Sequence, residues 1–226
     1  MANGVEAGPR DRSVCEELAH AGYLVASIAC EPNHTPSAEA VIAGKCAIRF
    51  LRRSADKYSV DERRIGVAGA SLGGALALLV GFTTQAAPFA VPGQYPNIPD
   101  HVSLVVSFAG PADWLTLPQG RPTGEHKEAI EKALRALAPL AYVRPNLPAV
   151  LLLHGTTDKF VPPEHAEKLA RALSKNQVPH RLLRLDRVGH TFSLIAHNGR
   201  PLPPEVKSVV LAFLQTHLTN PWSPAP

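Results

Sequence analysis

The chain has 226 residues, of which 45% are hydrophobic and 19% charged, and it carries a formal net charge of +4. This composition excludes a disordered or fibrous chain, and a length under about 250 residues predicts a single domain over residues 1–226. The basic residues are scattered, which argues against a nucleic-acid partner, and no apolar run reaches the ~18 residues of a membrane-spanning helix.

The first quarter of the chain contains two expected helices and one expected strand. Residues 12–20 fit a short helix, and the apolar run at 23–29 (YLVASIA) has the length of a strand. Thr35-Pro36 is typical of a helix start, and the apolar spacing that follows predicts an amphipathic helix over 38–58. The polar side of that helix is expected to carry Arg52, Arg53, Asp56 and Lys57.

Apolar runs of strand length alternate with helical segments in the rest of the chain. Further strands are expected at residues 64–69, 102–108, 148–154 and 180–186. Further helices are expected at residues 72–82, 124–137, 163–175 and 204–218. Near-continuous apolar strands predict a three-layer αβα sandwich with a mainly parallel sheet that is buried on both faces. Residues 83–100 and 115–137 are candidate cap segments.

The sharpest local pattern is Gly69-Ala70-Ser71-Leu72-Gly73, between an expected strand and an expected helix. That context is typical of a nucleophile elbow, a tight and strained turn that leaves a serine hydroxyl exposed above the sheet. Small residues at 69 and 73 are expected to let the chain cross over itself. The glycine spacing fits neither a dinucleotide fingerprint nor a phosphate-binding loop. The pattern therefore predicts that Ser71 is a nucleophile.

A serine hydroxyl needs a base to take its proton, and loops after two later strands offer candidates. Asp158 follows the fourth expected strand, and His190 follows the fifth. The order Ser71, Asp158, His190 is that of an α/β-hydrolase triad, in which histidine is the general base and aspartate orients it. Asp186 and His197 are alternatives, but Asp186 lies within an expected strand and His197 falls seven residues beyond His190.

Several other loop residues are candidates for the site. His154 lies next to the acid-bearing loop and is expected to orient it. Trp114, beside Asp113, fits either a pocket wall or the core, and the pattern leaves both open. Phe160 and Phe192 are candidate substrate-binding residues, with plain loop packing as the alternative.

Three stretches carry a family resemblance: RIGVAGASLGG, LLLHGTTDKFVPPEHAEKLARAL and GHTF. From residue 12 to its last helix, the chain resembles the α/β-hydrolase superfamily, on its carboxylesterase and lipase side near the acetyl and feruloyl esterases. The resemblance implies catalytic roles for Ser71, Asp158 and His190, and an oxyanion-binding N–H at Leu72. It implies a serine esterase that cleaves small-molecule esters through an acyl-enzyme. Short acyl chains are favoured because no long apolar lid is evident.

No cofactor and no metal are expected for this chemistry. The three cysteines form no Cys-x-x-Cys pair and have no histidine at metal-ligand spacing. The N-terminus has no apolar leader, so we expect a cytoplasmic protein.

The resemblance also implies parts that this sequence lacks. The residues before 12, MANGVEAGPRD, contain neither an apolar strand nor the His-Gly-Gly loop that supplies the family's first oxyanion donor. We therefore expect an N-terminally shortened sheet, in which the strands at 23–29 and 64–69 either leave a gap or pair directly. A homo-oligomer could then help to complete the sheet. Two other functions stay open: a serine peptidase resembling the prolyl-oligopeptidase group, and a non-catalytic relative with an incomplete oxyanion hole.

Overall fold

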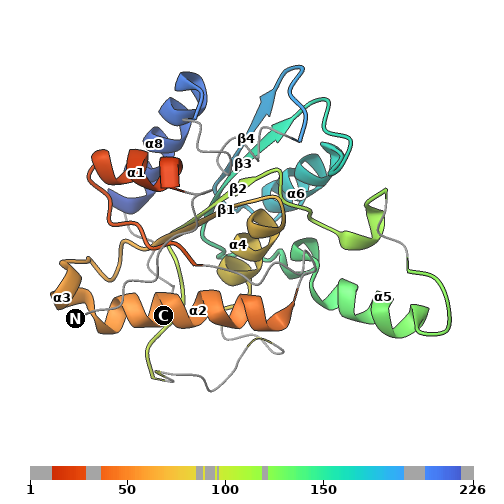
Figure 1. Cartoon of the computed structure of the whole chain (residues 1–226), viewed down its shortest axis with the longest axis horizontal. Coiled ribbons are helices and arrows are strands. Elements are labelled where there is room, and N and C mark those ends of the chain that lie inside the picture. The colour runs from red at the N-terminus through yellow and green to blue at the C-terminus, as the bar shows by residue number, and fades with distance from the viewer. Residues whose placement is uncertain are drawn as a thin grey trace.

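The computed structural model describes residues 12–28, 37–84, 89, 95, 97–118, 122–190 and 202–219. Its centre is a sheet of four parallel strands in the order β1-β2-β3-β4 (Figure 1). The strands are β1 (Gly66–Ala70), β2 (Leu104–Phe108), β3 (Ala149–Gly155) and β4 (His180–Leu185). The helices are α1 (Arg12–His20), α2 (Ala38–Arg53), α3 (Ala55–Tyr58), α4 (Leu72–Phe82), α5 (Lys127–Ala136), α6 (Glu164–Lys175) and α8 (Pro204–Thr219), with short 3-10 turns η1 (Trp114–Thr116) and η2 (Pro139–Tyr142).

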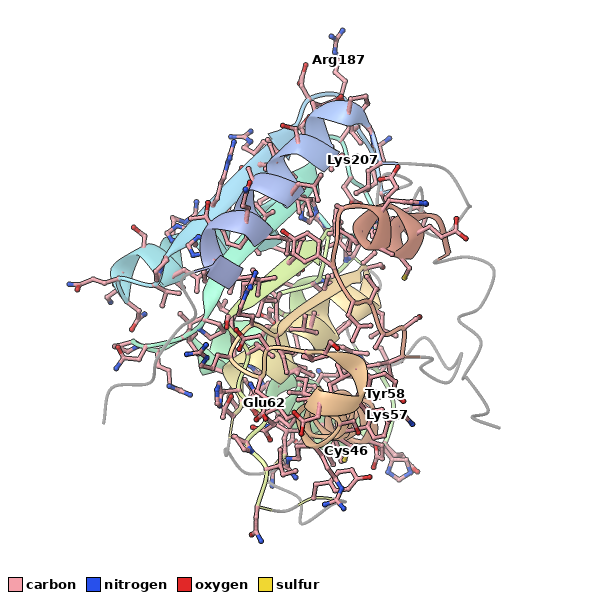
Figure 2. All side chains as sticks on the ribbon, turned by 90° about the vertical axis from the view of Figure 1, so that its left-hand side faces the viewer. Cys46, Lys57, Tyr58, Glu62, Arg187 and Lys207 are labelled. Carbon is pink, nitrogen blue, oxygen red and sulfur yellow. The ribbon has the colours of Figure 1, made fainter. Side chains whose placement is uncertain are left out.

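Helices cover both faces of the sheet, which confirms the expected three-layer αβα arrangement. Alternate strand residues point to opposite faces, so Val105 and Val150 pack with α2, α4 and α6, while Leu104 and Leu151 pack with α8. Helices α1 and α8 lie side by side on that second face, where Lys207 Nζ of α8 is 3.7 Å from Glu17 Oε1 of α1 (Figure 2). The core is therefore divided by the sheet into two apolar layers.

The strand expected at 23–29 is wrong for the described residues 23–28, which join no ladder. Leu24 is 57% exposed and Ile28 41% exposed. A strand must pair its backbone N–H and C=O groups with a neighbour. Among the described residues β1 has β2 as its only strand neighbour, so the apolar run at 23–28 neither pairs with β1 nor adds to the sheet.

The helix expected over 38–58 is divided into α2 and α3. The break falls at Ser54, whose backbone leaves the helical region (φ −103°, ψ 19°). The start of α2 also differs from the expected Thr35-Pro36 cap: Ser37 precedes the first turn, and its Oγ accepts a hydrogen bond from the Ala40 N–H at 3.1 Å.

Arg52 does not lie on a polar surface of α2, contrary to the expectation. It is 4% exposed, and its guanidinium donates to the carbonyl oxygens of Glu62 at 3.1 Å, Pro99 at 2.7 Å and His101 at 2.7 Å. Burial of a charged group is tolerated when its donors are satisfied. These acceptors come from loops that a helical pattern cannot locate.

The remaining helices and strands agree with the expected ones, with shifts at their ends of up to three residues. Of the candidate cap segments, 83–100 lies mostly outside the described residues. The segment 115–137 contains α5, which extends away from the sheet (Figure 1) and has no buried residue. No helix in the described part of the chain is long and apolar enough to span a bilayer.

Candidate active site

Ser71 lies in the one-residue turn between β1 and α4. Its backbone has φ 54° and ψ −120°, a conformation that is costly for a residue with a Cβ and that is found at functional sites. The turn is held because the Ser71 N–H donates to Phe108 O at 2.8 Å, and Ser71 O accepts from Gly74 N and Ala75 N at 3.0 and 3.2 Å. The serine is thus tied to β2 on one side and to the first turn of α4 on the other.

The two glycines of the turn have different environments. A Cβ on Gly69 would lie 2.1 Å from Gly73 O, whereas a Cβ on Gly73 would meet no described atom within 4 Å. The expectation that the crossing needs a small side chain is therefore correct for Gly69 and wrong for Gly73. Only the backbone of Gly73 takes part in the close approach.

The structure brings Ser71, His190 and Asp158 into one hydrogen-bonded chain. Ser71 Oγ is 2.9 Å from His190 Nε2, and His190 Nδ1 is 2.7 Å from Asp158 Oδ2. Their positions follow from the parallel sheet, because the carboxyl ends of β1, β3 and β4 meet at one edge. Residues far apart in the sequence therefore converge above that edge.

The loops that carry the acid and the histidine are joined directly. A Cβ on Gly155 would lie 2.1 Å from Val188 O, so only glycine permits this crossing. Thr156 N donates to Leu185 O at 2.9 Å, and Thr157 N donates to Val188 O at 3.0 Å. The spacing of the two loops is therefore fixed by backbone contacts close to the site.

The Asp158 carboxylate is fully buried and receives hydrogen bonds on both oxygens. Oδ1 accepts from the N–H groups of Phe160 and Val161, each at 2.9 Å, and Oδ2 faces His190 and lies 3.4 Å from His154 Nε2. Burial alone would raise the pKa of Asp158, but hydrogen bonds from His154, His190 and the Val161 N–H outweigh it. They hold this pKa well below its usual range, so the carboxylate is ionised at neutral pH.

Asp186 and Phe160 both lie at the surface of the protein. Asp186 is directed to solvent, with its side chain 79% exposed and paired with Arg187 at 3.2 Å. Phe160 is 63% exposed, and its ring centroid is 5.6 Å from that of His190. Phe192, His197 and residues 1–11, on which the expected lack of an oxyanion loop rests, lie outside the described residues.

Trp114 and Leu72 have defined surroundings. Trp114 is 7% exposed, packs against Ala75 and Ala138, and donates its Nε1–H to Leu137 O at 2.7 Å. The described contacts of this indole are thus with the protein interior. Leu72 is the first residue of α4, where N–H groups of the first turn have no carbonyl partner within the helix.

Sequence reasoning missed His165 on α6. It is 4% exposed, and its Nδ1 lies 3.2 Å from Ala112 N and 3.4 Å from Asp113 N, both of which donate to it. Burial and the nearby His154 lower the pKa of His165. The signal was the position of this histidine on the same helix face as the core residue Leu169.

Comparison with known proteins gives one matching family model and a set of relatives. The BD-FAE model matches residues 3–173, most of the chain. Esterase LipC of Mycobacterium tuberculosis is 29% identical over 226 aligned residues, which cover 91% of this chain and 53% of LipC. The chain thus spans about half the length of this curated relative.

Solved structures share the fold. The butyrate-bound esterase Est2 of Thermogutta terrifontis has a TM-score of 0.74 at 22% identity, over 100% of this chain and 83% of Est2. A truncated carbohydrate esterase from gut microbiota has a TM-score of 0.67 at 21% identity, over 79% of this chain and 68% of that one. From these matches, the chain belongs to the BD-FAE family and has the α/β-hydrolase fold.

Proposed function

We propose that the protein is a serine hydrolase that cleaves carboxylic esters with short acyl chains. The observation that carries the proposal is the chain of hydrogen bonds from Ser71 Oγ through His190 to Asp158, at 2.9 and 2.7 Å. The family membership and the description of LipC as an esterase support the same class of reaction.

The ionised Asp158 assigns the histidine proton. A carboxylate oxygen only accepts hydrogen bonds, so the proton of neutral His190 lies on Nδ1 and Nε2 is free to accept from the Ser71 hydroxyl. His190 then removes the Ser71 proton as Oγ bonds to the ester carbonyl carbon. Asp158 stabilises the imidazolium that forms.

The remaining steps follow from the same three groups. His190 returns the proton to the alcohol oxygen as the ester C–O bond breaks, which leaves an acyl group on Ser71. Water, deprotonated by His190, adds to this acyl carbon. The bond between the acyl carbon and Ser71 Oγ then breaks, His190 returns the proton to Oγ, and the carboxylic acid is released. The Leu72 N–H at the start of α4 is suited to hold the developing oxyanion, because the first turn of α4 directs its N–H groups and the positive end of the helix dipole there.

The preference for short acyl chains is inferred from solved relatives and from the exposed aromatic ring next to His190. Solved forms of Est2 are described as bound to butyrate and propionate, and Est2 is also phosphonylated by sarin and cyclosarin. In this chain the exposed ring of Phe160 lies beside His190, where it can contact the acyl or alcohol part of an ester.

The experiment is hydrolysis of a series of p-nitrophenyl esters, from acetate to long acyl chains, by the wild type and Ser71→Ala. We expect the highest kcat/KM on short acyl chains and a loss of roughly 10³-fold or more in Ser71→Ala, because the nucleophile is removed. The exposed Ser174 on α6 provides a matched control, and Ser174→Ala should retain wild-type turnover.

Two results would contradict the proposal. Ester hydrolysis that persists in Ser71→Ala would exclude the serine mechanism. Faster turnover of an aminoacyl-proline amide than of any ester would indicate a peptidase. Mass spectrometry after treatment with a fluorophosphonate gives an independent measure, since only an activated Ser71 should be labelled.

A further inference from the structure

Asp158 is contacted by a second histidine that the proposed mechanism does not use. His154, at the end of β3, has a side chain 2% exposed, and its Nε2 lies 3.4 Å from Asp158 Oδ2. This is the same carboxylate oxygen that faces His190 Nδ1 at 2.7 Å. One oxygen of the acid is thus placed between two imidazoles.

A closed ring of contacts surrounds the carboxylate. His154 Nε2 is 2.8 Å from Val161 O, and Val161 N donates to Asp158 Oδ1 at 2.9 Å. A carbonyl oxygen only accepts, so the His154 proton lies on Nε2, directed at Val161 O and Asp158 Oδ2. Rotation of the carboxylate would break at least one of these contacts.

We propose that His154 is a positioning residue for ester hydrolysis, which holds the Asp158 carboxylate in the plane that aims Oδ2 at His190 and takes up part of its negative charge. The inference rests on the proposed function of Ser71, Asp158 and His190. Its first consequence is geometric: the acid has one orientation. Its second is electrostatic: Asp158 attracts a protonated His190 less strongly than it would without the His154 donor.

The groups that interact electrostatically with Asp158 include His154 and His190. His165 on α6 interacts electrostatically with His154, and also with Asp113, Glu164 and Lys168. Because Nδ1 of His165 accepts from two backbone N–H groups, that ring is held neutral. The electrostatic effect of removing His154 is therefore exerted chiefly on Asp158 and His190.

The test compares three substitutions of His154 in the full chain. Gln places an amide N–H near the position of His Nε2, whereas Asn is too short and Leu has no donor. We expect His154→Leu and His154→Asn to lower kcat by about tenfold, the size of a lost hydrogen bond to a charged group, with KM little changed. His154→Gln should restore most of kcat.

The pH profile separates positioning from a structural role. In His154→Leu and His154→Asn, the acid limb of kcat/KM should move to higher pH by roughly half a unit, because a less satisfied Asp158 stabilises protonated His190 more. The downfield proton resonance of the His190 Nδ1–H should shift in the same variants. His126→Leu, at an exposed residue before α5, should leave both measurements unchanged.

The outcomes distinguish this inference from the proposed function. Folded His154→Leu or His154→Asn with the wild-type pH profile and resonance overturns the role of His154, even if Ser71→Ala is inactive. Equal losses in the Gln, Asn and Leu variants without a pH shift also overturn it, since they indicate a structural role. If the wild type hydrolyses no ester, the proposed function fails, while the resonance still reports whether His154 orients Asp158.

Discussion

The turn around Ser71 makes unequal steric demands on two glycines that look equivalent in the sequence. A Cβ at 69 would lie 2.1 Å from the carbonyl oxygen of Gly73, a distance that backbone atoms cannot accommodate without moving. A Cβ at 73 would face open space among the described residues. The tight turn at Ser71 therefore requires the absence of a side chain at residue 69, whereas residue 73 contributes only its backbone to the close approach.

Gly69→Ala and Gly73→Ala should have unequal effects on stability. We expect Gly69→Ala to lower the free energy of unfolding by about 2 kcal/mol or more, as overpacking does, and to slow fluorophosphonate labelling of Ser71. Gly73→Ala should be neutral or stabilising by up to about 1 kcal/mol, since it lies within α4. Urea denaturation measures both, and equal losses in the two variants would contradict this account.

The sequence predicted which residues meet at the site better than it predicted how they are held. Ser71, Asp158 and His190 each follow a strand of a parallel sheet, so their convergence follows from the fold alone. The contacts of His154 and His165 depend on the paths of short loops, and no periodicity reports those paths. The helical segment expected at 163–175 placed α6 correctly but could not show that His165 accepts hydrogen bonds from the loop after β2.

At the scale of elements, α2 is an amphipathic helix whose buried side is partly cationic. Lys45 is 2% exposed and Arg49 9% exposed. Lys45 Nζ donates to Thr83 O, just after α4, and Arg49 forms an ion pair with Asp100 at 2.8 Å. Together with Arg52, these side chains attach α2 to the residue after α4 and to the loops before β1 and β2.

Loss of the Arg52 guanidinium should destabilise the protein more than loss of an exposed arginine. Arg52→Leu removes three part-buried hydrogen bonds to the carbonyl oxygens of Glu62, Pro99 and His101. We expect its free energy of unfolding to fall by about 3 kcal/mol.

Arg64→Leu is the matched control, because Arg64 is exposed; its effect should stay within about 0.5 kcal/mol. Chemical denaturation of both variants decides the matter. A similar small change in each would show that the contacts of Arg52 contribute little to stability.

The features that were predicted wrongly depend on contacts with other segments of the chain. The helices α1, α4 and α8 agree closely with their expected ranges because a helix pairs its own backbone groups. The apolar run at 23–28 resembles a strand as closely as β2 does, yet it forms no ladder, because strand formation requires a neighbour. The prediction that Arg52 lies on a polar surface was wrong for a related reason, because the carbonyl oxygens that bind its guanidinium come from other segments.

At the scale of the whole molecule, burial is uneven across the sheet. Every residue of β2 and β3 is buried, whereas Gly66 and Ala68 of β1 are exposed. Two hydrogen bonds at the ends of β1 show which of its residues direct their backbone groups to β2: Ser103 N donates to Ile65 O, and Ser71 N donates to Phe108 O. Odd-numbered residues of β1 therefore direct their backbone groups to β2, and even-numbered residues direct theirs to the opposite side.

Amide hydrogen exchange should follow this arrangement. We expect the amides of β2 and β3 to exchange only through global unfolding. The Ala68 amide should exchange at least about 100-fold faster, because β1 can open locally there with little loss of buried contacts. Val67 and Gly69, whose amides face β2, should be slower than Ala68, which produces an odd–even alternation along β1. NMR-detected exchange at one pH and temperature measures each site. Equal protection of Ala68 and Val67 would contradict the position of β1 at the edge of the sheet. Such protection would mean that another segment or a second chain pairs with the free side of β1.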